Sequence, residues 1–94
     1  MKIEFDPVKN ERNIMLRGLP FQLAAGFDFE TAQFCVDTRK DYGETRIQAR
    51  GFVADRLHVL VFVESPRGIR VISLRKANKR EVKRYEKETQ SRTD

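Results

Sequence analysis

Residues 56–64 constrain the fold of this 94-residue chain most, because the segment is apolar at its centre on both faces of a strand. In strand geometry one face carries Leu57, Val59, Val61 and Val63, and the other carries His58, Leu60, Phe62 and Glu64. A strand with two apolar faces is normally internal to a sheet and covered from both sides. The sequence therefore predicts a layered fold with this segment inside its sheet.

Three other segments alternate as strands do: residues 31–37, 46–53 and 69–74. The pair Ala54-Asp55 and the stretch 65–68, Ser-Pro-Arg-Gly, supply turn residues on either side of the central segment. Connections this short favour antiparallel neighbours. We therefore expect an antiparallel sheet of three or four strands.

Helix signals precede these strands. Residues 1–5 alternate as a short strand, and Asp6-Pro7 has the pattern of an N-cap followed by proline in the first helical position. We expect this helix to end near Arg17, because Gly18 can adopt the left-handed conformation. A second short helix over residues 20–27 is expected to bury Phe21, Leu23 and Ala24.

A charged helix is predicted at the other end of the chain. Asn78 and Glu81 have the spacing of a capping box, and the helix should run to about residue 88. Only Val82 and Tyr85 give it an apolar stripe, so we expect Tyr85 to anchor it to the sheet. Residues 90–94 have the composition of a frayed tail.

Together these elements predict an α+β fold with a small antiparallel sheet, two N-terminal helices and a basic C-terminal helix. We expect one domain over residues 1–94, because a chain of this length cannot fill two cores. A hydrophobic content of 39% with seven Phe favours a globular interior. The longest apolar stretch, residues 59–63, is too short for a membrane span, so no membrane contact is expected.

Cys35 is the only cysteine, so the chain cannot form an internal disulfide. Small secreted domains usually need several disulfides, and no export signal is visible, so we expect a cytoplasmic protein. We expect Cys35 in the core, like the seven Phe. In the segment 31–37, Ala32, Phe34 and Val36 share one face of the predicted strand, and Thr31, Gln33, Cys35 and Asp37 share the other.

The net charge of +5 is concentrated at one end of the chain. Residues 67–94 carry ten Lys or Arg against four Asp or Glu, which leaves +6, and residues 1–66 carry nine against ten, which leaves −1. Such a basic block attracts polyanions and releases counterions when it binds phosphates. A charge run is also typical of a solvated face, so the block alone does not identify a partner.

Several kinds of site are absent from the sequence. The chain has no glycine-rich phosphate loop, no pair of spaced cysteines and no second histidine, so we expect no bound cofactor and no metal site. Ser65 or Ser73 with His58 and an Asp could be drawn as a triad, but their spacing does not resemble a nucleophile elbow.

The polar residues that lead into the basic block could instead cleave RNA without a metal ion. That reaction needs a group that takes the 2′-hydroxyl proton, a group that protonates the leaving oxygen, and cations that stabilise the phosphorane-like transition state. The predicted catalytic residues are Glu44, Arg46, His58, Arg70 and Arg75, and the predicted RNA-binding residues are Ser73, Lys76, Lys79 and Arg80. His58 and Glu44 are the candidates for proton transfer, and Arg75 is the candidate for the scissile phosphate.

Some of these residues have equally simple structural interpretations. A histidine near the start of a strand can form only an edge hydrogen bond, so His58 is left open. Arg70 could lie on a solvated face, and its role would be structural if it were buried against Glu44 or Glu81.

Three blocks of the sequence resemble the BrnT type of toxin. Phe5-Asp6-Pro7 with Lys9, Asn13, Gly18 and Phe21 resembles its F-x-W-D-P-x-K-x-x-x-N-x-x-K-H-G-V-x-F start. The segment 41–46 followed by Gly51 resembles its D-x-G-E-x-R-x-x-x-x-G motif. Residues 70–85, R-V-I-S-L-R-K-A-N-K-R-E-V-K-R-Y, resemble its R-x-I-S-x-R-x-A-x-x-x-E-x-x-x-Y signature.

The resemblance implies a RelE/ParE-like fold whose curved sheet carries the active surface. It implies an endoribonuclease toxin of a type II toxin–antitoxin pair that arrests growth by degrading RNA. It also implies a BrnA-like antitoxin of the ribbon-helix-helix type, which covers the toxin and binds operator DNA on behalf of the pair.

Two other functions remain open at this point. ParE-like relatives inhibit gyrase on the same fold. A non-catalytic module that binds RNA or DNA would need only the basic block and no acid or base.

Overall fold

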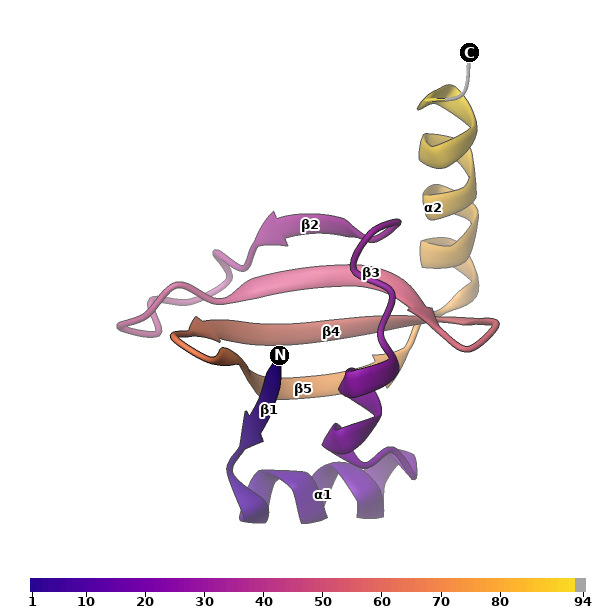
Figure 1. The fold of residues 1–94 in the computed structure, drawn as a ribbon. Coiled ribbons are helices and arrows are strands. Elements are labelled where there is room, and N and C mark those ends of the chain that lie inside the picture. Colours follow the sequence, from indigo (N-terminus) through magenta and orange to yellow (C-terminus); the bar gives the residue numbers. More distant parts are fainter. Residues whose placement is uncertain (93–94) are drawn as a thin grey trace.

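The computed structural model describes residues 1–92 of the chain as a mixed α+β fold (Figure 1). The elements in chain order are β1 (Lys2–Phe5), α1 (Pro7–Arg17), the 3-10 helix η1 (Phe21–Gly26), β2 (Gln33–Val36), β3 (Ile47–Val53), β4 (Arg56–Ser65), β5 (Gly68–Lys76) and α2 (Lys79–Arg92). No helix in this part of the chain is long and apolar enough to cross a membrane.

The five strands form one sheet in the order β1-β5-β4-β3-β2. β4 lies at the centre, which confirms the prediction from its two apolar faces. β2 to β5 each pair antiparallel with the next strand in the chain. The short turns on either side of β4 predicted this for its pairing with β3 and with β5. The expectation of a purely antiparallel sheet of three or four strands is wrong, because β1 adds a fifth strand that pairs with β5 in parallel.

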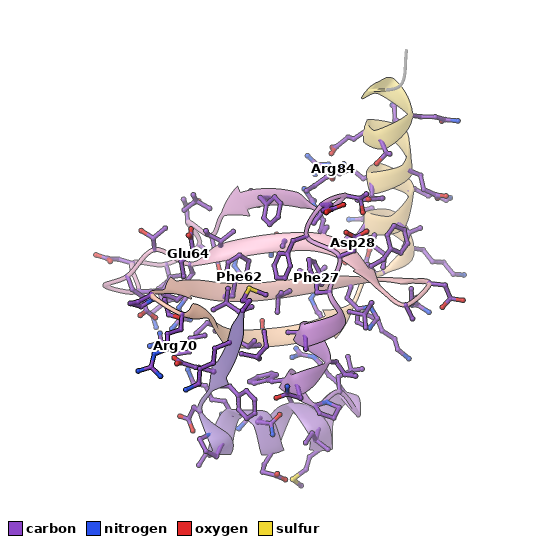
Figure 2. The ribbon with its side chains drawn as sticks, in the orientation of Figure 1. Phe27, Asp28, Phe62, Glu64, Arg70 and Arg84 are labelled. Carbon is purple, nitrogen blue, oxygen red and sulfur yellow. The ribbon has the colours of Figure 1, made fainter. Side chains whose placement is uncertain are left out.

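The two faces of β4 bury different sets of side chains. Leu60 and Phe62 belong to the main core, which also contains Phe21, Ala24, Phe27, Ala49, Val71 and Leu74. Figure 2 shows Phe27 and Phe62 on the sheet face that η1 and the chain leading to β2 cross. Leu57 and Val59 belong to a smaller second core with Ala77 and Tyr85. The first turns of α2 therefore pack on part of the sheet face opposite the main core.

The N-terminal helix has the boundaries that its caps predicted. The Asp6 side chain accepts a hydrogen bond from Val8 N, and Gly18 closes the helix in the left-handed conformation with φ of 69°. The second expected helix is instead the 3-10 turn η1. Phe21 and Ala24 are buried there, but Leu23 is 38% exposed, contrary to the expectation.

Asn13 connects α1 to the sheet. Its side chain is buried, and its Nδ2 donates to the carbonyl oxygens of Leu19 at 2.8 Å and Leu74 at 2.9 Å. Arg17 Nη1 donates to Asn13 Oδ1 at 2.9 Å. β1 pairs with β5 only as far as Val71. The Asn13 amide therefore supplies a donor to the Leu74 carbonyl oxygen, which lies beyond that pairing.

We expect Asn13→Ala to lower the free energy of unfolding by about 2–4 kcal/mol, because two buried carbonyl oxygens lose their donor. For a domain of this size the melting temperature should fall by about 10 °C or more. Thermal unfolding followed by circular dichroism measures this, with the exposed neighbour Arg12→Ala as the control. Equal melting temperatures for the two variants would contradict this role of Asn13.

Gly51 marks a close approach between the sheet and the chain that covers it. A Cβ at this position would lie 2.6 Å from Cζ of Phe27 and 2.9 Å from Cβ of Ala32. A larger residue would displace the Phe27 ring, which belongs to the main core.

β2 departs from its predicted burial. Phe34 is 50% exposed and Cys35 is exposed, so the expectation that these two residues belong to the core is wrong, and Val36 on the same face as Phe34 is 57% exposed. The reason is topology: β2 is a four-residue edge strand that pairs only with β3. Ala32, which precedes the strand, is buried.

α2 begins at the predicted capping box. Glu81 N donates to Asn78 Oδ1 at 2.8 Å, and Asn78 N donates to Glu81 Oε1 at 2.9 Å. The helix continues to Arg92, so residues 90–92 of the expected frayed tail are helical, and residues 93–94 lie outside the described residues. Tyr85 anchors the helix as predicted: its ring packs edge-on against Phe52, and its hydroxyl donates to Thr31 O at 2.7 Å.

Candidate active site

The sheet face that α2 partly covers carries a row of cations. Arg50 of β3 pairs with Val59 of β4, and Val59 pairs with Arg75 of β5. Residues directly opposite each other on antiparallel strands point to the same face. Arg50 and Arg75 therefore stand on either side of a buried valine.

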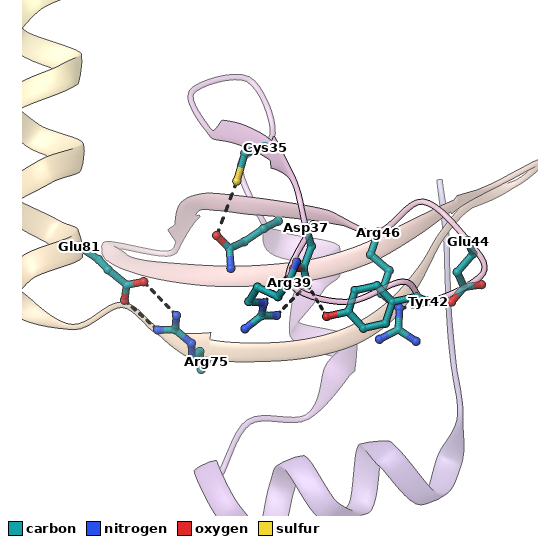
Figure 3. Close-up of polar contacts among 9 residues, drawn as sticks. Cys35, Asp37, Arg39, Tyr42, Glu44, Arg46, Arg75 and Glu81 are labelled. Carbon is teal, nitrogen blue, oxygen red and sulfur yellow. Dashed lines mark hydrogen bonds and ion pairs between the residues drawn. The ribbon is translucent and has the colours of Figure 1, made fainter.

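A loop between β2 and β3 adds a third arginine to this row. The Asp37 carboxylate accepts from Arg39 Nε at 2.8 Å and Nη2 at 2.7 Å, and from the Tyr42 hydroxyl at 3.2 Å. The hydrogen bond from Arg39 holds the pKa of Asp37 well below its usual range. Figure 3 shows the Arg39 head group between Arg75 and Tyr42. Arg39 is close enough to Arg75 for their positive charges to repel each other.

Arg75 makes a bidentate ion pair with Glu81 of α2. Its Nη1 and Nη2 donate to the Glu81 carboxylate at 2.8 and 2.9 Å (Figure 3). This hydrogen bonding is the main reason that the pKa of Glu81 falls to about 2. A guanidinium has five N–H donors. Two of them bind Glu81 and one points to the Lys76 carbonyl oxygen, so Arg75 keeps donors for a ligand. We call Arg39, Arg50, Arg75 and Glu81 the Arg75 cluster.

A second group lies farther along β5. Arg70 Nη2 donates to both oxygens of Glu44, at 2.7 and 2.6 Å, and Arg46 Nε donates to Glu44 Oε2 at 3.3 Å. The bond from Arg70 is the main cause of the lowered pKa of Glu44. The Arg46 guanidinium also stacks over the Tyr42 ring, 4.1 Å from its centroid. We call Glu44, Arg46 and Arg70 the Glu44 cluster.

The two clusters are centred on different stretches of β5. Arg70 and Arg75 are five residues apart on one strand, which corresponds to roughly 15 Å at the usual rise of a strand. Arg70 pairs with Glu44 as the structural interpretation required, yet 44% of its side chain remains exposed. Arg75 is also accessible, with 34% of its side chain exposed.

The structure places the predicted site residues in three groups. Glu44, Arg46, Arg70 and Arg75 reach the cationic face, as does Ser73, which pairs with Val61. Lys79 and Arg80 are exposed at the start of α2, beside Glu81.

His58 and Lys76 do not join the others. They pair with each other one residue away from Val59 and Arg75, so they point to the opposite face of the sheet. His58 is buried at 4% exposure, and its Nδ1 lies 2.8 Å from the Arg56 carbonyl oxygen, which matches the structural interpretation of this histidine.

Sequence reasoning missed Arg39, Arg50 and Glu81 as members of the site. Arg50 could have been found, because it shares its strand parity with Arg46 in the predicted strand 46–53. Glu81 was predicted as a capping residue and as a possible partner of Arg70, but its ion pair is with Arg75 instead. Among residues 1–92, no three His, Cys, Asp or Glu side chains gather closely enough to hold a metal ion.

A family model described as the ribonuclease toxin BrnT, of type II toxin–antitoxin systems, matches residues 5–81. The chain belongs to the BrnT family. The matched range contains both clusters of the cationic face and ends at Glu81. No curated protein matches the chain.

Membership of the BrnT family indicates the general kind of activity and the general kind of partner of this protein. The family is one of ribonuclease toxins, and a type II system pairs such a toxin with an antitoxin. On this BrnT chain, arginines that flank a buried strand are suited to a polyanionic RNA backbone.

Proposed function

We propose that this chain is an endoribonuclease that cleaves RNA at the Arg75 cluster without a metal ion. The observation that carries the proposal is the bidentate pair between Arg75 and Glu81 on an open sheet face, with Arg39 and Arg50 beside it. It brings together a cation for the phosphate and a carboxylate for the proton.

In this reaction the RNA phosphate competes with Glu81 for the Arg75 guanidinium. Glu81, released from part of that ion pair, accepts the proton of the 2′-hydroxyl. The 2′ oxygen forms a bond to phosphorus, the bond from phosphorus to the 5′ oxygen breaks, and water protonates the leaving oxygen. The products are a 2′,3′-cyclic phosphate and a 5′-hydroxyl. Arg75, Arg39 and Arg50 stabilise the additional negative charge of the transition state.

The Glu44 cluster and the start of α2 bind the flanking RNA in this proposal. Because Arg70 and Arg75 are roughly 15 Å apart along β5, we assign Arg46 and Arg70 to a neighbouring part of the RNA backbone. Ser73, Lys79 and Arg80 extend the binding surface. His58 is assigned a structural role, because it is buried on the opposite face.

We expect Glu44→Ala to raise KM for RNA about tenfold while kcat changes little, because the variant disorders the arginines that hold RNA in both ground and transition states. Steady-state kinetics on a fluorogenic RNA oligonucleotide measures both constants. Asp41→Ala, an exposed acidic residue of the same loop, is the control. A large fall in kcat with KM unchanged would return Glu44 to the catalytic group.

We also propose that a ribbon-helix-helix antitoxin neutralises the toxin and binds operator DNA for the pair. The family supports an antitoxin, and the basic surface supports an acidic partner. The order of an N-terminal helix, antiparallel strands and a basic terminal helix supports a RelE-like relationship.

Two assays separate the proposed function from its alternatives. Purified protein is incubated with total RNA in EDTA, and separately with gyrase and relaxed plasmid DNA. The proposal expects fragmented RNA and unimpaired gyrase. Intact RNA with inhibited gyrase would instead identify a ParE-like inhibitor, and RNA that is bound but uncut would identify a non-catalytic module.

A further inference from the structure

A groove runs along one flank of α2. It consists of two adjoining hollows of about 600 and 760 Å³ that share Phe52, Lys83, Tyr85 and Glu86. Leu57, Ala77 and Val82 complete its apolar floor in the first hollow. Phe52 and Val82 are only half-buried there, so the second core of the protein is open on this side.

Beyond Val82 and Tyr85, α2 has little apolar contact with the rest of the protein. Among the helix residues whose side chains are described, only Val82 and Tyr85 contribute to the second core. Figure 1 shows the distal half of α2 standing away from the sheet. Helices of about this length are marginal in water unless tertiary contacts support them. The helix and its groove thus form an amphipathic surface whose apolar part is not covered by another element of the described chain.

The rim of the groove favours an acidic occupant. Arg56, Lys79 and Lys83 line the first hollow against Asp55 and Glu86, and the whole segment from residue 67 onward carries an excess of six positive charges, ten minus four. A second copy of this chain would bring the same positive charge to the groove, which disfavours self-association. An apolar floor beside a helix and a cationic rim match an amphipathic helix with acidic flanks.

We propose that an acidic amphipathic helix of the antitoxin docks in this groove, against Phe52, Val82 and Tyr85, with its carboxylates on Lys83. The inference rests on the antitoxin partner of the proposed function. Val82 follows Glu81 directly, and consecutive helical residues point about 100° apart. A helix held in the groove therefore lies beside the Arg75 cluster, where the remainder of the antitoxin can reach the RNA-binding face.

The test compares variants of the full chain for binding to the purified antitoxin of its own pair, by isothermal titration calorimetry. Lys83→Glu reverses a rim charge, and Val82→Ala removes part of the floor. Arg84→Glu is the matched control, because it makes the same charge change on the next residue, which lines neither hollow. We expect Kd to rise about tenfold or more for the first two variants and less than about threefold for the control.

Ribonuclease activity without antitoxin and helical content by circular dichroism are measured on the same samples. Both should match wild type in all three variants, since none of these residues belongs to the proposed catalytic or RNA-binding surface. Unchanged Kd for Lys83→Glu and Val82→Ala would overturn the inference, as would an equal loss in Arg84→Glu or an antitoxin that does not bind the wild-type chain.

The two proposals fail in different ways. If the wild-type chain does not cut RNA but the Kd pattern holds, the ribonuclease proposal is wrong and the groove assignment stands. If sedimentation shows that the chain alone forms dimers that Lys83→Glu dissociates, the groove serves a second copy and the antitoxin assignment is wrong.

Discussion

Replacing Arg75 by Ala is expected to lower the rate of RNA cleavage by at least about 100-fold, the usual cost of removing one preorganised donor to transition-state charge. Arg75 is the central cation of its cluster, with Arg39 and Arg50 nearby and Glu81 bound to it. In cells, the variant should lose most of its ability to arrest growth. Cleavage of a labelled RNA under single-turnover conditions measures the chemical step directly.

Two further variants show whether a loss of activity in Arg75→Ala is specific to the guanidinium at this position. Arg75→Lys keeps the charge but loses the planar fork, so it should recover only part of the rate. Arg84→Ala removes an exposed arginine that pairs with Glu88 on α2, and it should cleave like wild type. The melting temperature of Arg75→Ala should stay within about 8 °C of wild type, because a partly exposed ion pair contributes at most about 1 kcal/mol. Full activity of a folded Arg75→Ala would remove Arg75 from the mechanism.

Glu81→Gln should have the second large effect, a loss of about 100-fold or more in kcat/KM, because the amide cannot accept the 2′-hydroxyl proton. The substitution is nearly isosteric, and Gln can replace Glu in a capping box. The first turn of α2 should therefore stay folded. Circular dichroism checks this point. Glu86→Gln, an exposed residue of the same helix, is the matched control and should have wild-type activity.

The pH dependence separates Glu81 from an imidazole base. The pKa of Glu81 lies at about 2, lowered chiefly by Arg75, so the carboxylate is ionised throughout the range above its ordinary pKa near 4.5 and loses its charge only as the pH falls toward 2. Because kcat/KM reports the ionisations of the free enzyme, we expect it to be nearly constant from pH 5 to 8. A fall as the pH drops through about 6.5, the usual range of histidine, would indicate an imidazole base instead.

The local elements of the fold could be predicted because their signals are local. Asp6, Pro7 and Gly18 determine the ends of α1 through the hydrogen bonds and backbone angles of its caps. Asn78 and Glu81 determine the start of α2 in the same way. The central position of β4 followed from its composition, since only a covered strand buries both Leu60 and Val59.

The parts that the sequence did not reveal depend on contacts between distant residues. β1 alternates as a strand does, but its parallel partner β5 begins more than sixty residues later, at Gly68. β2 has the same alternation as a core strand, and Phe34 and Val36 are exposed only because no strand follows it at the sheet edge. Alternation predicts a strand but not its place in the sheet.

The candidate site shows the same limit. The sequence identified Glu44, Arg46, Arg70 and Arg75 by charge and by their resemblance to family motifs, yet it could not show that they form two clusters. That separation follows from the number of residues between Arg70 and Arg75 along β5. His58 was attractive as a lone imidazole, but its strand parity opposes that of Arg75 through the pairing of β4 with β5.

The central claim is that the Arg75 cluster promotes attack of the RNA's 2′-hydroxyl on the neighbouring phosphate. The most direct test of this claim uses two oligonucleotides. One is an RNA that the toxin cuts at a single position, and the other has a deoxynucleotide on the 5′ side of that cut. Both are incubated with the toxin in EDTA, and the ends are identified by mass spectrometry. The account predicts a 2′,3′-cyclic phosphate and a 5′-hydroxyl from the first and no cleavage of the second. Cleavage of the deoxy-substituted strand, or fragments with a 5′-phosphate, would contradict it.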